Sequence, residues 1–390
     1  VSVTTGAYNT LIGGLAGDAI TTANNNTALG YAALSTATTG TQNVALGQSA
    51  ATSLTTGSQN TAVGTNALNS NTTASFNTAL GWQSLYSNTT GTFNIGIGPY
   101  ALHSTTTPAG NIAIGYAALE ENTTGANNVG IGYKALEANT TASSNTAVGY
   151  QAGYSNTTGS DITAVGYQAL DSNTTGNYNT AIGLSALQSN TTASSNTAVG
   201  RRAMFGNSTG GDNIGIGYHA MYSNTTGSSN VSIGKDALFS NTTASNNTAV
   251  GYQAGYSSLT GNWNNYLGRS AGYSNTAGIH NSAFGEAALY SNTGSYNTAY
   301  GSTALYSNTT ANYNVAVGYQ AGQDNTTGTI DAFGAFALGD NTTGTSNVAV
   351  GGYDGSTIAA LRMNSTGSSN TAIGVGSLGN NTTSINNTAV

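Results

Sequence analysis

The sequence predicts an all-β fold, a parallel β-solenoid, and three observations support this prediction. A block with the pattern N-[TIV]-[AG]-[VIL]-G recurs about every 17 residues along the chain of 390. The fifth position of the block is glycine in every repeat that reaches it. Only 5% of the residues are charged and 2 are proline, whereas 54 are glycine, a composition unlike that of a globular domain. Short repeats of this kind stack on one another in solenoids.

The period is nearly unbroken from Asn9 to Asn387, which places 23 coils in the chain. Two steps are shortened to 16 residues, ending at Asn297 and Ile330, and one is lengthened to 23 residues, ending at Asn370. The consensus coil reads N-T-A-V-G-Y-Q-A-L-Y-S-N-T-T-G-S-S, and we number its columns from one to seventeen. We therefore expect residues 1–390 to form a single continuous solenoid domain, with an outward insertion within residues 352–363.

The glycine of column five is expected to mark a corner of the coil, because a fixed glycine indicates a positive φ or a place where no Cβ fits. Column four is apolar or aromatic, column nine is usually Leu or Met, and columns three and eight are almost always Ala or Gly. We expect columns four and nine to face a narrow interior. The first twelve corner glycines are Gly13, Gly30, Gly47, Gly64, Gly81, Gly98, Gly115, Gly132, Gly149, Gly166, Gly183 and Gly200.

A single coil cannot be stable alone. It buries about three large apolar side chains at roughly 1.5–3 kcal/mol each, whereas ordering its backbone costs roughly 1–2 kcal/mol per residue. Stacking resolves this, because each strand then hydrogen-bonds to the coils on both sides. Column one is Asn in 21 of the 23 coils, so we expect an amide ladder at that turn.

Several functional classes are disfavoured by composition. The chain has no cysteine, a net charge of -7 without a basic stripe, and no apolar run of the roughly 20 residues that a membrane span needs. Its three histidines, His103, His219 and His280, fall in different columns many coils apart. We therefore expect no enzymatic activity, cofactor, metal, nucleic-acid partner or membrane-spanning segment.

Column twelve carries a repeated N-[TS]-T pattern. These asparagines are candidate glycan acceptors on an exposed turn, and the same Asn-Thr-Thr-Gly sequence is also good turn chemistry, with side chains bonding their own backbone. We favour the turn. The asparagines are Asn71, Asn88, Asn122, Asn139, Asn156, Asn173, Asn190, Asn207, Asn224, Asn241, Asn308, Asn325, Asn341, Asn364 and Asn381.

Aromatic residues form two further columns. Stacked rings could dock a glycan, a partner fibre or an apolar surface, and more often they stabilise the ladder through contacts with their neighbours. Column ten contains Phe205, Tyr222, Phe239, Tyr256, Tyr273, Tyr290 and Tyr306 in seven successive coils. Column six contains Tyr116, Tyr133, Tyr150 and Tyr167.

The N-T-A-V-G and N-I-G-I-G blocks, each followed by Ala two or three residues later, resemble the head repeats of trimeric autotransporter adhesins. The segment N-T-A-V-G-Y-Q-A-G-Y from Asn247 to Tyr256 also resembles repeats in tail-fibre proteins of phages and bacteria. The resemblance covers the whole chain. It implies a left-handed parallel β-roll assembled as a trimer, and a location outside the cell, on the cell surface or on the virion surface.

The expected function is structural and non-enzymatic: the shaft of an extracellular fibre or filament, adhesin-like or tail-fibre-like, that serves as a rigid spacer or attachment rod. The alternative is a carbohydrate- or ice-binding solenoid that uses Thr, Asn and Tyr ladders. The expected partners are copies of the chain itself, as a homo-oligomer or an end-to-end filament, and surface glycans. Because Val1–Gly6 matches the second half of a coil and Asn387–Val390 the start of one, we expect the rod to continue, in a longer chain or through joined copies.

Overall fold

A computed structural model describes residues 5–390, so Val1–Thr4 of the expected first half-coil lie outside the described residues. Two compact units divide the chain, Val1–Ser195 and Asn196–Val390, and each is considered by itself. Among residues 5–390 every regular element is a strand, which confirms the all-β prediction. No helix there is long and apolar enough to cross a membrane.

Each strand lies in the first half of its coil. The strands of the first unit are β1 (Thr10–Ile12), β2 (Thr27–Leu29), β3 (Val44–Leu46), β4 (Thr61–Val63), β5 (Thr78–Leu80), β6 (Ile95–Ile97), β7 (Ile112–Ile114), β8 (Val129–Ile131), β9 (Thr146–Val148), β10 (Thr163–Val165) and β11 (Thr180–Ile182). Those of the second unit are β12 (Thr197–Val199), β13 (Ile214–Ile216), β14 (Val231–Ile233), β15 (Thr248–Val250), β16 (Asn265–Leu267), β17 (Ser282–Phe284), β18 (Thr298–Tyr300), β19 (Val315–Val317), β20 (Ile330–Phe333), β21 (Asn347–Val350), β22 (Thr371–Ile373) and β23 (Thr388–Ala389).

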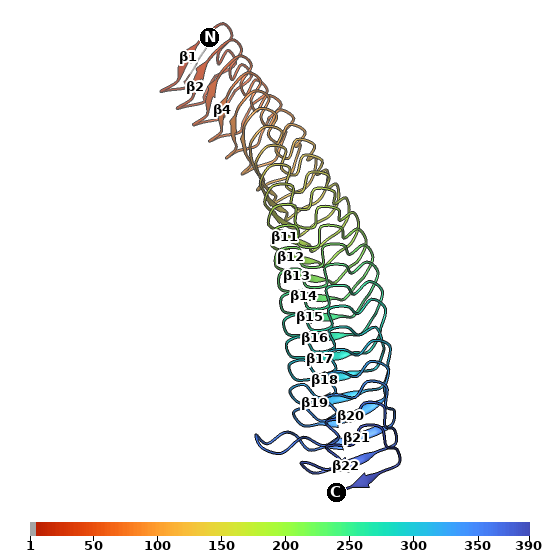
Figure 1. Cartoon of the computed structure of the whole chain (residues 1–390). Helices are drawn as coiled ribbons and strands as arrows, with labels where there is room; N and C mark the ends of the chain where they lie inside the picture. Colours follow the sequence, from red (N-terminus) through yellow and green to blue (C-terminus); the bar gives the residue numbers. More distant parts are fainter. Residues whose placement is uncertain (1–4) are drawn as a thin grey trace. The chain divides into compact units, whose positions relative to one another are not determined.

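Successive strands pair in parallel, in the register that the repeat dictates (Figure 1). In the first unit Thr146 pairs with Thr163, and in the second Thr248 pairs with Asn265, each one repeat further along the chain. This arrangement confirms the parallel β-solenoid with a 17-residue repeat. That the two units form one continuous solenoid stays a prediction.

The strand directions correct one expectation about the interior. Column three faces inward, and its alanines, such as Ala147, are fully buried. Because side chains alternate along a strand, columns two and four face outward, and Ile12 and Ile114 of column four are 57% and 37% exposed. The expectation that column four faces the interior was therefore wrong. Column nine does face inward, since Leu34 and Leu68 are fully buried.

Both physical reasons for a column-five glycine apply. Gly64 has φ +129° and Gly200 has φ +132°, and a Cβ on either would lie 2.6 Å from the carbonyl oxygen of the next corner glycine. L side chains rarely adopt this backbone region. Consecutive coils therefore approach each other too closely at this corner for any side chain.

Columns seven, nine and seventeen adopt positive φ without glycine, which sequence reasoning missed. Ala32, Leu34 and Gln42 of one coil have φ of +56°, +50° and +62°. Each such residue costs on the order of 1–2 kcal/mol of strain. Hydrogen bonds between coils hold the strained turn, since the backbone N–H of Ala32 donates to the carbonyl of Gly14 at 2.9 Å and that of Leu34 to Ala50 at 3.1 Å.

Glycine replaces the buried column-nine side chain in a few coils, and a bulky residue nearby fills the space. A Cβ on Gly153 would lie 2.9 Å from Leu136 and 3.7 Å from Ile162, which stands where most coils have the column-one Asn. Gly322 and Ile330 repeat this exchange, because a Cβ on that glycine would lie 2.5 Å from the isoleucine. The interior thus keeps its total volume while the position of the bulk changes.

The largest exchange surrounds Tyr266, which occupies column three of its coil in place of the usual Ala and is 1% exposed. Its ring fills the space left by Gly255 on one side and by Gly272 on the other. Asn275 donates its side-chain amide to the phenol oxygen. Burial raises the pKa of Tyr266 far above its usual range, so the phenol stays protonated at all ordinary pH values.

The six extra residues of the longest coil lie between Gly351 and Ala359. Residues 353–357 are exposed and project as a loop from the stack near β21 (Figure 1). The loop leaves the stacking intact, because Val348 of β21 still pairs with Thr371 of β22. At its base the N–H of Ala360 donates to the carbonyl of Gly351 at 3.0 Å.

The exchange between Gly153 and Ile162 can be measured with a double-mutant cycle. We expect Gly153→Leu alone to overpack the interior and Ile162→Asn alone to leave a gap, each lowering the free energy of unfolding by about 1–3 kcal/mol. The double variant restores the consensus coil, so it should unfold close to wild type in urea, with a coupling of at least about 1 kcal/mol. Thr158→Ala, on the exposed column fourteen, should combine additively with Ile162→Asn. Additivity in the Gly153 cycle as well would contradict the exchange.

Candidate functional site

The seven rings of column ten form a continuous stack in the second unit. Adjacent ring centroids are 4.9–5.2 Å apart and the planes are within 4–11° of parallel. Each ring is half-buried. Because neighbouring rings cover each other's faces, the interior of the stack offers a ligand only ring edges. This geometry favours the stabilising role over a binding role.

Column six forms a second stack, in the first unit. Tyr116, Tyr133, Tyr150 and Tyr167 lie 5.1–5.4 Å apart between centroids, with planes within 13° of parallel. Their side chains are 42–49% exposed. These rings also cover one another, so they too present edges along most of the stack.

A third stack, in column seventeen, was missed by sequence reasoning. Trp263, His280, Tyr296 and Tyr313 occupy this column in four successive coils, at centroid distances of 5.0, 5.2 and 5.1 Å. All four have positive φ, between 56° and 61°. The signal was available in the sequence, because reading down column seventeen finds these residues by the same method that found column ten.

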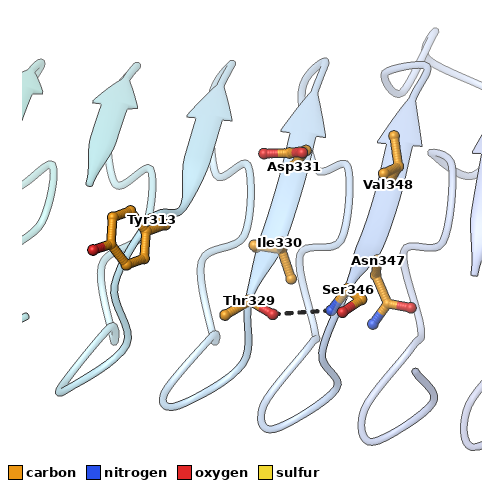
Figure 2. A pocket seen from close by; sticks show the side chains of 7 residues that line it. All are labelled: Tyr313, Thr329, Ile330, Asp331, Ser346, Asn347 and Val348. Atoms are coloured by element: carbon orange, nitrogen blue, oxygen red, sulfur yellow. Dashed lines mark hydrogen bonds between the residues drawn. The ribbon is translucent and has the colours of Figure 1, made fainter. Parts of the chain in front are cut away.

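The column-seventeen stack ends at a hollow of about 290 Å³ (Figure 2). After Tyr313 the next two residues of the column are the small Thr329 and Ser346, so the far side of the ring has no aromatic neighbour among the described residues. Tyr313 is 70% exposed. Figure 2 shows Tyr313, which lies just before β19, on one side of the hollow, with Asp331 on β20 and Val348 on β21.

The polar groups of this hollow differ in whether they are already paired. The backbone N–H of Ser346 donates to Oγ1 of Thr329 at 3.0 Å. The buried amide of Asn347 donates to the carbonyl of Gly367 at 2.7 Å. Within residues 5–390 the carboxylate of Asp331 makes no hydrogen bond or ion pair. The hollow therefore combines one open ring face with one unpaired, half-exposed carboxylate.

The histidines do not converge on one site. His103 stacks on Tyr86 at 5.2 Å, His219 has its Nδ1 3.7 Å from a carboxylate oxygen of Asp236, and His280 belongs to the column-seventeen stack. Burial lowers the pKa of His103 and His219, so both imidazoles are neutral at pH 7. Over the described part of the chain, no three His, Cys, Asp or Glu side chains lie close enough together to hold a metal ion.

The column-twelve asparagines lie inside the coil, with the partial exception of Asn381. Asn139 is fully buried, and its amide donates to the carbonyl of Ala142 at 3.1 Å and to Oδ1 of Asn122 at 2.9 Å. Its own Oδ1 accepts from Asn156 at 3.1 Å. A glycan is attached through the amide nitrogen, which here already donates both of its protons. The geometry fits the turn interpretation and leaves the fourteen buried amides inaccessible in the folded chain.

Comparison of the sequence with models of protein families gives no match, and comparison with curated proteins gives none either.

The structural role of column twelve can be separated from a role in glycosylation. Asn139→Ala and Thr141→Ala both destroy the same N-T-T acceptor pattern, and only the first removes the buried amide. We expect Asn139→Ala to lower the free energy of unfolding by about 2–3 kcal/mol, because the buried groups of its neighbours lose their partner. Thr141→Ala changes an exposed residue and should stay within about 0.5 kcal/mol of wild type. Equal effects of the two variants in urea unfolding would contradict this assignment.

Proposed function

We propose that this chain is a non-enzymatic structural rod, the shaft of an extracellular fibre or filament that spaces or attaches something at its end. The observation that carries the proposal is the regular pairing of each strand with its neighbours in the coils before and after it, throughout each unit. Such a backbone offers few unpaired segments to proteases or to thermal fraying. The low charge of the chain is consistent with a mechanical role.

An exposed apolar stripe supports association of the rod with copies of itself. Columns two and four point outward and carry Thr, Val, Ile and Leu, and a stripe of this kind is costly to leave in water. Charged residues are nearly absent from this stripe. Burying the stripe against a partner therefore removes few charged groups from water, and the energetic cost of burial is low. The most exposed column-four residues are Ile12, Leu29, Leu80, Ile114 and Ile182 in the first unit and Ile216, Ile233, Leu267, Tyr300, Phe333, Val350, Ile373 and the last residue, Val390, in the second.

Carbohydrate binding is a second candidate, and one observation favours it over ice binding. The hydroxyls of the column-thirteen threonines donate to backbone carbonyls of the next coil, as Thr55 does to Thr72 at 2.9 Å and Thr140 to Thr157 at 3.2 Å. These hydroxyls are therefore not free to bind a regular layer of water. The aromatic column seventeen, in contrast, ends in an open hollow that a sugar could enter.

The location of the protein tests the rod proposal. An antibody against the purified chain, used for immunogold electron microscopy of the source cells or particles, should label surface fibres along their length. Antibody absorbed with purified protein serves as the control. Labelling confined to the cell interior would contradict an extracellular shaft.

Self-association can be tested by placing charge on the stripe. We expect the triple variant Leu80→Lys, Ile114→Lys and Ile182→Lys to sediment as a monomer of 38.8 kDa, whereas the wild-type chain sediments as a larger species. The matched control is the triple variant Thr73→Lys, Thr107→Lys and Thr175→Lys. It adds the same charge on exposed threonines of column fourteen and should sediment like wild type. Identical sedimentation of all three proteins would contradict docking through the stripe.

A further inference from the structure

We infer that the hollow beside Tyr313 binds one neutral pyranose ring of a carbohydrate. The inference makes the carbohydrate-binding candidate specific and rests on it, while being independent of the rod proposal. Its first support is the free ring face. Tyr313 is stacked on Tyr296 at 5.1 Å on one side, and its other side opens onto the hollow. The apolar C–H face of a pyranose packs well against such an aromatic face, as apolar ligand surfaces do in small-molecule sites.

The second support is the carboxylate of Asp331. It lies in column two, beside Val315 and Val348 in the pairing register of β19, β20 and β21. Asp331 is the only charged residue that column two contains. A carboxylate accepts hydrogen bonds strongly, and sugar hydroxyls are donors that would satisfy it. The ring face and the carboxylate together match the two sides of a sugar, one apolar and one rich in hydroxyls.

Size and charge narrow the ligand class. A volume of about 290 Å³ lies at the lower end of small-molecule sites and fits one monosaccharide unit better than a longer buried segment. The lining residues include no cationic side chain, and the chain as a whole carries a net charge of -7. An acidic sugar would meet repulsion from Asp331 without compensation. A neutral pyranose, held as a single unit or as one residue of a surface glycan, is therefore favoured.

The departures from the repeat coincide at this hollow. The coil from Asn314 to Thr329 is one residue short, Ile330 replaces the column-one Asn, and Asp331 replaces the usual Thr or Val. The amide ladder is interrupted at the same place, because Ile330 has no side-chain amide oxygen to accept the backbone N–H of Asn347. That N–H instead donates to the backbone carbonyl of Thr329, at 3.4 Å. In a chain with such a regular repeat, the place where several local rules fail together is where a functional site is expected.

Saturation-transfer NMR of the full chain with a panel of methyl glycosides tests the inference. The panel is methyl β-D-glucopyranoside, methyl β-D-galactopyranoside, methyl α-D-mannopyranoside and the methyl glycoside of N-acetyl-D-glucosamine, with sorbitol as an open-chain polyol that lacks a ring face. We expect saturable binding of at least one glycoside, with Kd on the order of 1–10 mM for so small a contact, and no saturable binding of sorbitol.

Two variants locate the binding. Tyr313→Ala and Asp331→Asn should each weaken the binding at least tenfold, and Tyr313→Phe should retain it. Asp331→Asn keeps the shape of the side chain, so its effect does not depend on a change in folding, which circular dichroism checks. Tyr178→Ala is the matched control, because Tyr178 is a 65% exposed tyrosine of the same column without a carboxylate in the adjoining column two.

The outcomes are distinct. Sugar binding that is unchanged in both Tyr313→Ala and Asp331→Asn would overturn this site and leave carbohydrate binding elsewhere on the chain. Equal binding of sorbitol and the glycosides would overturn recognition of a ring. Absence of saturable binding for the whole panel, at concentrations well above the expected Kd, would overturn both the site and the carbohydrate-binding candidate.

Discussion

The buried side-chain amide of asparagine is the interaction on which the stacking of coils depends. In column one, Oδ1 of Asn60 accepts the backbone N–H of Asn77 at 3.0 Å, while Nδ2 of the same Asn60 donates to the carbonyl of Ala74 at 2.9 Å. One side chain thus joins a turn within its own coil to the backbone of the next coil. Because an unpaired buried amide costs about 1–3 kcal/mol, each coil depends on its neighbour having the same residue at the same place. This mutual dependence explains why Asn persists in column one better than the apolar residues do in column nine.

The narrow interior explains how the remaining side chains are distributed. Column three holds Ala in most coils, as at Ala147 and Ala164, so the buried volume of such a coil comes mainly from the single large side chain of column nine, such as Leu34. Most of the aromatic and β-branched residues therefore lie outside, where they pack on the equivalent residues of adjacent coils, and the exceptions such as Tyr266 and Ile162 fill space that a column-nine glycine leaves. The result is a protein whose outer surface carries stacked rings and an aliphatic stripe, while its interior is rich in paired amides. Function, in such an arrangement, is expected where a surface stack is interrupted.

Much of this fold could be predicted from the sequence, because period and glycine placement follow directly from chain geometry. The 17-residue repeat implied parallel strands in register, and the column-five glycine implied a close contact such as that at Gly64. The direction of column four was not predictable from its apolar character, since that character suits either face of a strand; only the burial of column three decides it. The positive φ of Leu34 gave no signal, because leucine ordinarily avoids it. The hollow beside Asp331 depends on residues from four coils and on a missing residue, which no single column reveals.

The exchanges of volume around Gly153 and Tyr266 have a consequence for folding. In a chain of near-identical coils, a strand could join the stack one repeat too early or too late with most of its hydrogen bonds intact. At the exchanged positions such a slip would place a bulky ring or an isoleucine against a filled interior, and would set a glycine beside empty space. The irregular coils would thus act as register marks, distributed among interchangeable neighbours, that make the correct alignment lower in energy than any shifted one.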